Sequence, residues 1–232
     1  MKVLSTAAKW FFMLCLPALL LGASIGGATN SLWLYKYGLY KYDVSQALAN
    51  EGLQLSDLEI EKIYAGLISY FNSNEEYINF TVVKDGKPIN LFSPEEVIHF
   101  RDVKGLIWLD YWLLLGTLIY TLGYSGVSLF WKKHKYWRRL AQAVAGGSSM
   151  TPALMLVLAL GTVLDFSQLF YRFHLLFFSN TFWSAEGYML LLFPSAFFYD
   201  AALFCALATT AGAVILGGVA GSYLLSSRKR NQ

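Results

Sequence analysis

The stretch that decides the fold is Leu91–Gly105, LFSPEEVIHFRDVKG. It opens with the signals of a helix start: Ser93 as the N-cap, Pro94 at the first helical position and Glu96 closing a capping box. The chain then continues into a long apolar run that begins at Gly105. This order predicts one helix that starts in water and continues into a membrane.

Helical spacing places Glu95, His99 and Asp102 on one face of that helix, at positions i, i+4 and i+7. An acid, a titratable base and a second acid would therefore line up just above the membrane surface. A solvated helix face with ordinary ion pairing shows the same pattern. The pattern indicates a functional site only together with a second histidine on the same side of the membrane.

The composition excludes a soluble globular protein, because 56% of the residues are hydrophobic and only 14% are charged. A spanning helix needs roughly 20 apolar residues to cross the hydrocarbon core. Four segments meet this requirement approximately: Trp10–Thr29, Leu106–Phe130, Met150–Leu164 extended at either end, and Ala201–Leu225. The expected fold is a mainly α membrane protein with four transmembrane helices.

The distribution of charge predicts the orientation. Ten of the 18 basic residues flank the expected spans on one side, and no acid accompanies them. The other eight share the opposite side with all 15 acids, which gives net charges of +10 and −7. The ten are Lys2, Lys9, Lys132, Lys133, Lys135, Arg138, Arg139, Arg228, Lys229 and Arg230. By the positive-inside rule both termini are cytoplasmic.

These spans divide the chain into seven parts. The first is a transmembrane helix that we interpret as a retained signal anchor, because its apolar region is longer than that of a cleaved signal peptide. We expect this helix at 1–30, an extracytoplasmic domain at 31–104, a second span at 105–131, a basic cytoplasmic loop at 132–149, a third span at 150–165, an outer interfacial segment at 166–200, and a fourth span with a basic tail at 201–232.

The extracytoplasmic domain is predicted to be a small α+β domain. Ser56 and Glu59 form a second capping box, which opens an amphipathic helix to roughly Phe71. The apolar stretches on either side of Asp85-Gly86 predict a β-hairpin. The aromatic residues that begin the domain are typical of a membrane-interface belt. A sugar- or lipid-binding platform is the alternative. They are Trp33, Tyr35, Tyr37, Tyr40 and Tyr42.

The second outer segment, from Asp165 to Trp183, is too aromatic for a solvated loop. It carries Asp165, Arg172 and His174 among phenylalanines, and as a helix it would lie at the outer interface. Ionisable residues at that depth are functional candidates, because their desolvation is costly without a partner or a role. The alternative is an interface helix whose His and Arg side chains extend to the water.

His99 and His174, with the nearby carboxylates and Arg172, suit general acid/base catalysis in which a cation stabilises an oxyanion. A histidine accepts a proton near neutral pH while a carboxylate orients its ring. A metal site built from His99, Asp102 and His174 is the alternative, but no H-E-x-x-H spacing supports it. We expect neither a metal nor another cofactor.

A protein nucleophile is less evident. Cys15 and Cys205 both fall inside expected spans, where we interpret them as small apolar core residues, and no Gly-x-Ser-x-Gly elbow occurs.

Two motifs, FSPEEVIHFRDVK and FxxFHxxFFxNxxW, resemble those of the lipoprotein intramolecular transacylase (Lit) family of four-span bacterial membrane proteins. The resemblance implies an acyltransferase that moves an acyl chain from the glyceryl ester of a diacylated lipoprotein to the amine of its N-terminal cysteine. The product is a lyso-form lipoprotein.

The resemblance further implies that His99 and His174 are catalytic. The residues around the two histidines, rather than the resemblance, indicate Asp102, Arg172, Glu95 and Asp165 as supporting groups. The resemblance and the charge distribution together place the protein in the bacterial plasma membrane, with the active site on the extracytoplasmic side. The expected partners are the N-terminus of a diacylated lipoprotein and membrane lipids, and not nucleic acid.

Two other functions remain open at this stage. One is a non-enzymatic lipid- or lipoprotein-binding membrane protein of the same fold, and the other is a metal-dependent membrane hydrolase. Two imidazoles in a shared cavity open to the outer leaflet would favour catalysis, whereas side chains that lie far apart or face bulk water would favour the binding protein.

Overall fold

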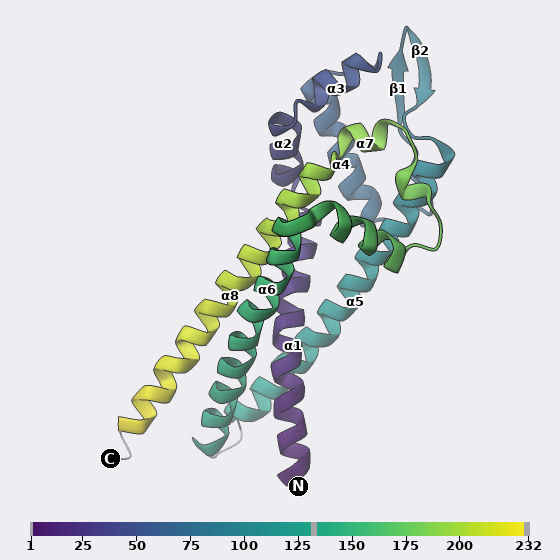
Figure 1. Ribbon diagram of the computed structural model, residues 1–232. Coiled ribbons are helices and arrows are strands. Elements are labelled where there is room, and N and C mark those ends of the chain that lie inside the picture. The colour runs from purple at the N-terminus through teal and green to yellow at the C-terminus, as the bar shows by residue number, and fades with distance from the viewer. Residues whose placement is uncertain (1, 131–133, 230–232) are drawn as a thin grey trace. The chain divides into compact units, whose positions relative to one another are not determined.

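The computed structural model describes residues 2–130 and 134–229 of the chain. The described elements are mainly helices, with one two-stranded sheet (Figure 1). They are α1 (Lys2–Thr29), α2 (Leu32–Lys41), α3 (Val44–Asn50), α4 (Asp57–Phe71), β1 (Thr81–Lys84), β2 (Lys87–Asn90), α5 (Pro94–Phe130), α6 (His134–Phe177), the 3-10 turn η1 (Phe182–Ser184), α7 (Tyr188–Leu192) and α8 (Ser195–Lys229). Within these residues α1, α5, α6 and α8 are long and apolar enough to cross a membrane.

The chain divides into two compact units, which are described separately. The bundle unit comprises residues 1–26, 110–161 and 203–232, and the head unit comprises residues 27–109 and 162–202. The first holds most of the apolar helical residues, and the second holds both sequence motifs.

The start of α5 follows the prediction closely. The Ser93 N–H donates to Glu96 Oε2 over 2.8 Å, and the Glu96 N–H donates to Ser93 Oγ over 3.2 Å. From Pro94 the helix runs without interruption to Phe130, so the prediction of one continuous helix is confirmed. The capping box predicted for α4 is also present, and α4 ends at the predicted residue.

The predicted hairpin is confirmed as well. Strands β1 and β2 pair antiparallel, and Lys84 lies opposite Lys87. Asp85 (φ 52°) and Gly86 (φ 75°) both adopt positive φ, as the two central residues of a type I′ turn must.

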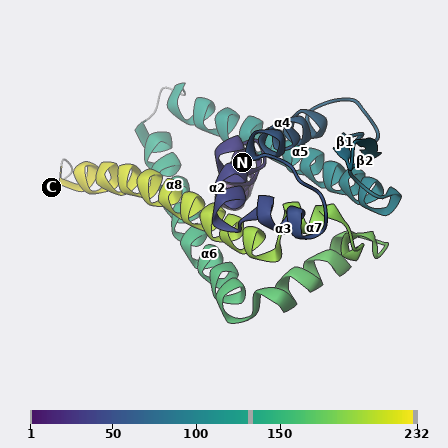
Figure 2. The same cartoon turned by 90° about the horizontal axis from the view of Figure 1, so that it is seen from above.

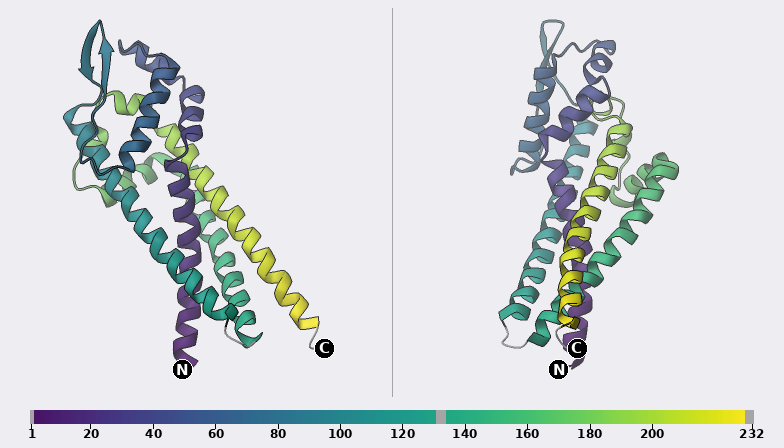
Figure 3. Two further views of the ribbon diagram at one scale, coloured as in Figure 1. Left: turned by 180° about the vertical axis from the view of Figure 1, so that it is seen from behind. Right: turned by 90° about the vertical axis from the view of Figure 1, so that its left-hand side faces the viewer.

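The core of the head unit is an aromatic cluster. Tyr35 of α2 stacks on Tyr64 of α4 with ring centroids 5.5 Å apart, and both rings contact Phe193. The Tyr64 hydroxyl donates to the Leu192 carbonyl over 2.9 Å, and burial raises the pKa of Tyr64. The cluster therefore joins α7 to α4. Helix α2 packs beside α4 (Figure 3), and α3 packs against α7 (Figure 2).

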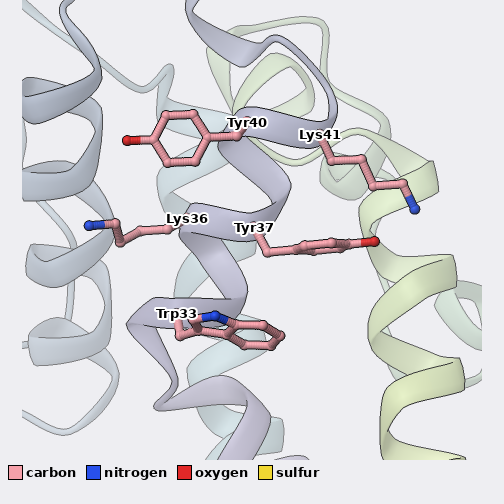
Figure 4. A pocket seen from close by; sticks show the side chains of 5 residues that line it. All are labelled: Trp33, Lys36, Tyr37, Tyr40 and Lys41. Carbon is pink, nitrogen blue, oxygen red and sulfur yellow. The ribbon is translucent and has the colours of Figure 1, made fainter.

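The exposed face of α2 carries Trp33, Lys36, Tyr37, Tyr40 and Lys41, which line an open hollow of about 490 Å³ (Figure 4). The Trp33 and Tyr37 rings stack at 5.9 Å. Lys36 pairs with an acid on α4, and Lys41 pairs with an acid at the start of α8, which raises the pKa of Lys41. The sequence did not predict a helix here. The interface belt stays a prediction.

In the bundle unit, α1 packs against the later part of α5 and the first part of α6. Its core contains Phe12, Leu16 and Ala143, and Tyr120 and Tyr124 pack against them. Both cysteines are free and buried.

The loop expected at 132–149 is not observed, because residues 134–149 are helical and belong to α6. Lys132 and Lys133 lie outside the described residues. Residues 134–145 are mostly good helix formers, and nothing among them stops the helix. Gly146 and Gly147 continue it because they pack against α1, where Met13 and Leu16 lie close to the positions that their side chains would take.

Candidate active site

His99 and His174 come together in the head unit. His99 lies on α5, two turns after its N-cap, and His174 lies near the end of α6. Their ring centroids are 6.0 Å apart and their planes are inclined by 32°. The side chains are only 7% and 6% exposed. The two sequence motifs therefore meet at a buried pair of imidazoles.

Aromatic rings surround this pair. Phe178 contacts both imidazoles, with centroids 4.9 Å from His99 and 5.4 Å from His174. Phe170 and Trp183 lie 4.3 Å and 4.7 Å from the His174 ring. We call these five residues the histidine cluster. Its apolar walls replace water around the two rings, so any charge that develops there depends on fixed dipoles.

The hydrogen bonding of His174 defines its tautomer. Its Nδ1 lies 2.7 Å from the backbone carbonyl oxygen of Phe170. A carbonyl oxygen only accepts, so Nδ1 carries the hydrogen, and in the neutral ring the lone pair is at Nε2. The other imidazole differs, because Nδ1 of His99 is buried and has no hydrogen-bond partner among the described residues.

Asp102 reaches the cluster indirectly. Its Oδ2 accepts a hydrogen bond of 2.8 Å from the Asn180 side-chain amide. The Oδ1 of Asn180 accepts the backbone N–H of Phe182 over 3.0 Å. Asp102 therefore holds the turn that carries Trp183, and its observed hydrogen bond goes to an amide rather than to an imidazole.

The three other predicted supporting residues lie outside the cluster. Glu95 and Arg172 are exposed, and neither makes a described contact with a histidine. Arg172 lies two residues before His174, which turns it about 200° around the helix. Asp165 is exposed and has non-helical backbone angles (φ −157°, ψ 80°); its Oδ1 accepts the Gln168 N–H over 3.0 Å. Its observed role is to cap the last helical segment of α6.

Glu96 was not predicted as a site residue. In the structure it is buried, with only 1% of its surface exposed. Besides closing the capping box with Ser93, its Oε1 accepts the backbone N–H of Met189 over 2.7 Å. A side chain at position 187 would collide with this carboxylate, so Gly187 makes the approach possible. The sequence predicted the capping-box bond of Glu96 but not its bond to Met189. Asn180 and Trp183 were visible in the second motif but had no assigned role.

Metal ligands do not gather at the cluster. Among residues 2–130 and 134–229, no group of three or more His, Cys, Asp or Glu side chains is placed to hold a metal ion.

Comparison with known proteins identifies the family of this chain. The family model of the lipoprotein intramolecular transacylase Lit matches residues 10–198, which include both motifs. The chain belongs to the Lit family. Membership makes this Lit-family chain an acyltransferase. No curated protein matches it in a direct sequence comparison.

Solved Lit structures share the fold. The structure of Lit from Bacillus cereus, determined in meso as an integral membrane protein, has a TM-score of 0.79 and 19% identity, covering 99% of this chain and 100% of that one. A Bacillus cereus Lit structure with a histidine-to-arginine mutation has a TM-score of 0.74 and 19% identity, with coverages of 100% and 96%. This Lit-family chain is therefore a multi-pass membrane protein with the Lit fold.

Proposed function

We propose that this chain transfers an acyl group from the glyceryl ester of a diacylated lipoprotein to the α-amine of its N-terminal cysteine, which produces a lyso-form lipoprotein. The observation that carries the proposal is the pair of buried imidazoles, 6.0 Å apart, in a member of the Lit family. The proposed catalysis is general acid/base transfer of protons by these two histidines.

His174 suits the role of base because its Nε2 holds the lone pair while Nδ1–H is fixed by the Phe170 carbonyl. In the proposed step Nε2 takes a proton from the attacking amine as the nitrogen–carbon bond forms. The carbon–oxygen bond of the ester then breaks, and the same proton passes to the glyceryl oxygen. His99 supplies a second hydrogen-bonding group beside the reacting atoms.

The substrate provides the nucleophile, because the amine and the ester belong to one molecule. Intramolecular attack draws much of its rate from orientation, so the protein has to position the two groups and move one proton. The phenylalanines of the histidine cluster would lie against acyl chains. The asymmetry of the basic residues supports a site on the extracytoplasmic side.

The test is to express the chain in cells that make diacylglyceryl lipoproteins but lack N-acylation. A reporter's N-terminal lipopeptide is then fragmented in a mass spectrometer. The transfer conserves total mass, so only fragments that carry the acyl group on the amine demonstrate it. We expect these fragments with the wild type. His99→Ala and His174→Ala should each lower their formation by about 100-fold or more.

His134→Ala is the matched control, because it changes the third histidine of the chain, which belongs to neither motif, and it should leave the transfer unchanged. The losses from the two cluster histidines should be strongly non-additive in the double variant, since groups that act as a unit are lost together. A wild type that leaves the amine free contradicts the proposed function. Active histidine variants contradict the site.

A further inference from the structure

Three rings of the histidine cluster carry an N–H group: the two imidazoles and the indole of Trp183. The indole ring centroid lies 4.7 Å from that of His174 and 5.8 Å from that of Tyr171, whose ring is inclined to the indole by 72°. The Nε1 atom is buried and has no hydrogen-bond partner among the described residues.

Two other tryptophans show the usual arrangement. The indole N–H of Trp108 donates to the Phe71 carbonyl over 3.1 Å, and that of Trp137 donates to the Leu129 carbonyl over 2.9 Å. An indole N–H can only donate, and a buried donor without an acceptor is destabilising. Trp183 therefore keeps an unused donor in an apolar site, and Nδ1 of His99 is another buried polar atom of the histidine cluster that has no partner among the described residues.

This donor is held in place rather than left on a free loop. Trp183 belongs to the turn η1, whose first N–H, that of Phe182, donates to the Asn180 side chain. Asn180 in turn donates to Asp102, one turn along α5 from His99. The tether links the indole to the same helix as one catalytic histidine, which is the preorganisation that stabilisation of a transition-state charge requires.

We propose that Trp183 is a catalytic residue whose indole N–H donates to the carbonyl oxygen of the ester under attack. This inference rests on the proposed function. When the amine nitrogen bonds to the carbonyl carbon, the electron pair of the C=O bond moves to that oxygen, and the hydrogen bond stabilises the resulting oxyanion. When the carbon–oxygen bond to the glycerol breaks, the carbonyl re-forms. The indole keeps its proton throughout.

The test replaces Trp183 with 3-benzothienylalanine, which keeps the bicyclic ring but has sulfur in place of N–H. Two measurements are made on the purified full-length protein: the rate of acyl transfer in a synthetic diacylglyceryl lipopeptide, and the affinity for the dialkyl ether analogue, which has no carbonyl. The rate should fall by about 100-fold, because the hydrogen bond stabilises the oxyanion of the transition state. The affinity for the ether analogue should change by less than about 2-fold, because that analogue has no carbonyl oxygen to accept the hydrogen bond. Trp183→Phe should show the same loss of rate.

Trp108→3-benzothienylalanine is the matched control, because it removes an indole N–H that donates to a backbone carbonyl. It should lower the melting temperature and leave the rate nearly unchanged. If the 3-benzothienylalanine variant of Trp183 transfers the acyl group at the wild-type rate, the proposed role of Trp183 is overturned and the proposed function of the chain is not. A loss confined to binding of the ether analogue also overturns that role. A wild type that leaves the amine free overturns the proposed function and this inference together.

Discussion

The Asp102 carboxylate accepts a hydrogen bond from Asn180, and Asn180 accepts the Phe182 N–H. The two bonds use both ends of one amide, so its orientation is fixed from two sides. An amide that faces a carboxylate must present its nitrogen, and an amide that faces a backbone N–H must present its oxygen. At the scale of single residues, this pair sets the position of the turn that bears Trp183.

This chemistry predicts an asymmetric result for single substitutions. Asp102→Asn keeps an oxygen that can accept from Asn180 and weakens one charge-assisted bond, so it should cost about 1 kcal/mol of unfolding free energy. Asn180→Asp opposes two carboxylates and removes the donor, so it should cost more and displace the turn, with about a 10- to 100-fold loss of transfer rate.

The exchanged double variant, Asp102→Asn with Asn180→Asp, is the decisive one. It restores a donor opposite an acceptor, and the new carboxylate at position 180 still accepts the Phe182 N–H. We expect it to regain most of the stability and rate lost in Asn180→Asp, with a coupling energy of about 1–2 kcal/mol. The quantities are measured by thermal unfolding and by transfer rate. Additive losses would show that the two side chains do not interact.

At the scale of elements, Glu96 joins α5 to α7. One carboxylate accepts two backbone N–H groups, from Ser93 of the cap and from Met189 of α7. An ionised carboxylate is acceptor-only, which suits two facing donors. The same residue thus starts the helix that carries His99 and secures a segment about ninety residues further along the chain.

Glu96→Gln should destabilise the protein, because the new amide nitrogen would face one of the two N–H groups. A buried donor left without an acceptor costs about 1–3 kcal/mol. That corresponds to a fall in melting temperature of roughly 2–12 °C for a chain of this size. Glu95→Gln is the matched control: it makes the same change one residue earlier at an exposed side chain and should alter stability by less than about 0.5 kcal/mol. Equal melting temperatures for the two variants would contradict the role of Glu96.

The elements that could be predicted are those with local causes. Short stretches of sequence determine the two capping boxes, the positive-φ turn of the hairpin and the apolar continuation of α5. The continuity of α6 through Gly146 and Gly147 depends on α1, and the second bond of Glu96 depends on Met189. No local pattern contains such partners.

In the candidate site, too, local sequence indicated some features, and others depend on tertiary packing. Both histidines could be selected from their motifs, because ionisable residues stand out in aromatic and apolar surroundings. The sequence could not show that Arg172 is exposed and lies outside the histidine cluster, since tertiary packing decides which side of the helix faces His99. Trp183 could not be given a role, because a buried N–H without an acceptor is visible only in the structure.

At the scale of the whole molecule, the orientation in the membrane is the largest inference drawn from charge alone. Basic residues near the ends of spans tend to stay in the cytoplasm, so the ten bases that no acid accompanies predict that the termini lie there. The hairpin tip at Asp85 would then lie outside the cell, in the head unit that contains both histidines. The basic segment around His134 would lie inside.

Single-cysteine labelling tests this orientation in intact cells, in a background where Cys15 and Cys205 are replaced by alanine. A maleimide that cannot cross membranes should label Asp85→Cys and leave His134→Cys unlabelled until the cells are opened. The background variant should retain near-normal transfer activity, since the proposed mechanism uses no thiol. Labelling of position 134 in intact cells would reverse the orientation and place the histidine cluster on the cytoplasmic side. In that case the proposed substrate could not reach it, because the acylated cysteine of a lipoprotein lies beyond the membrane.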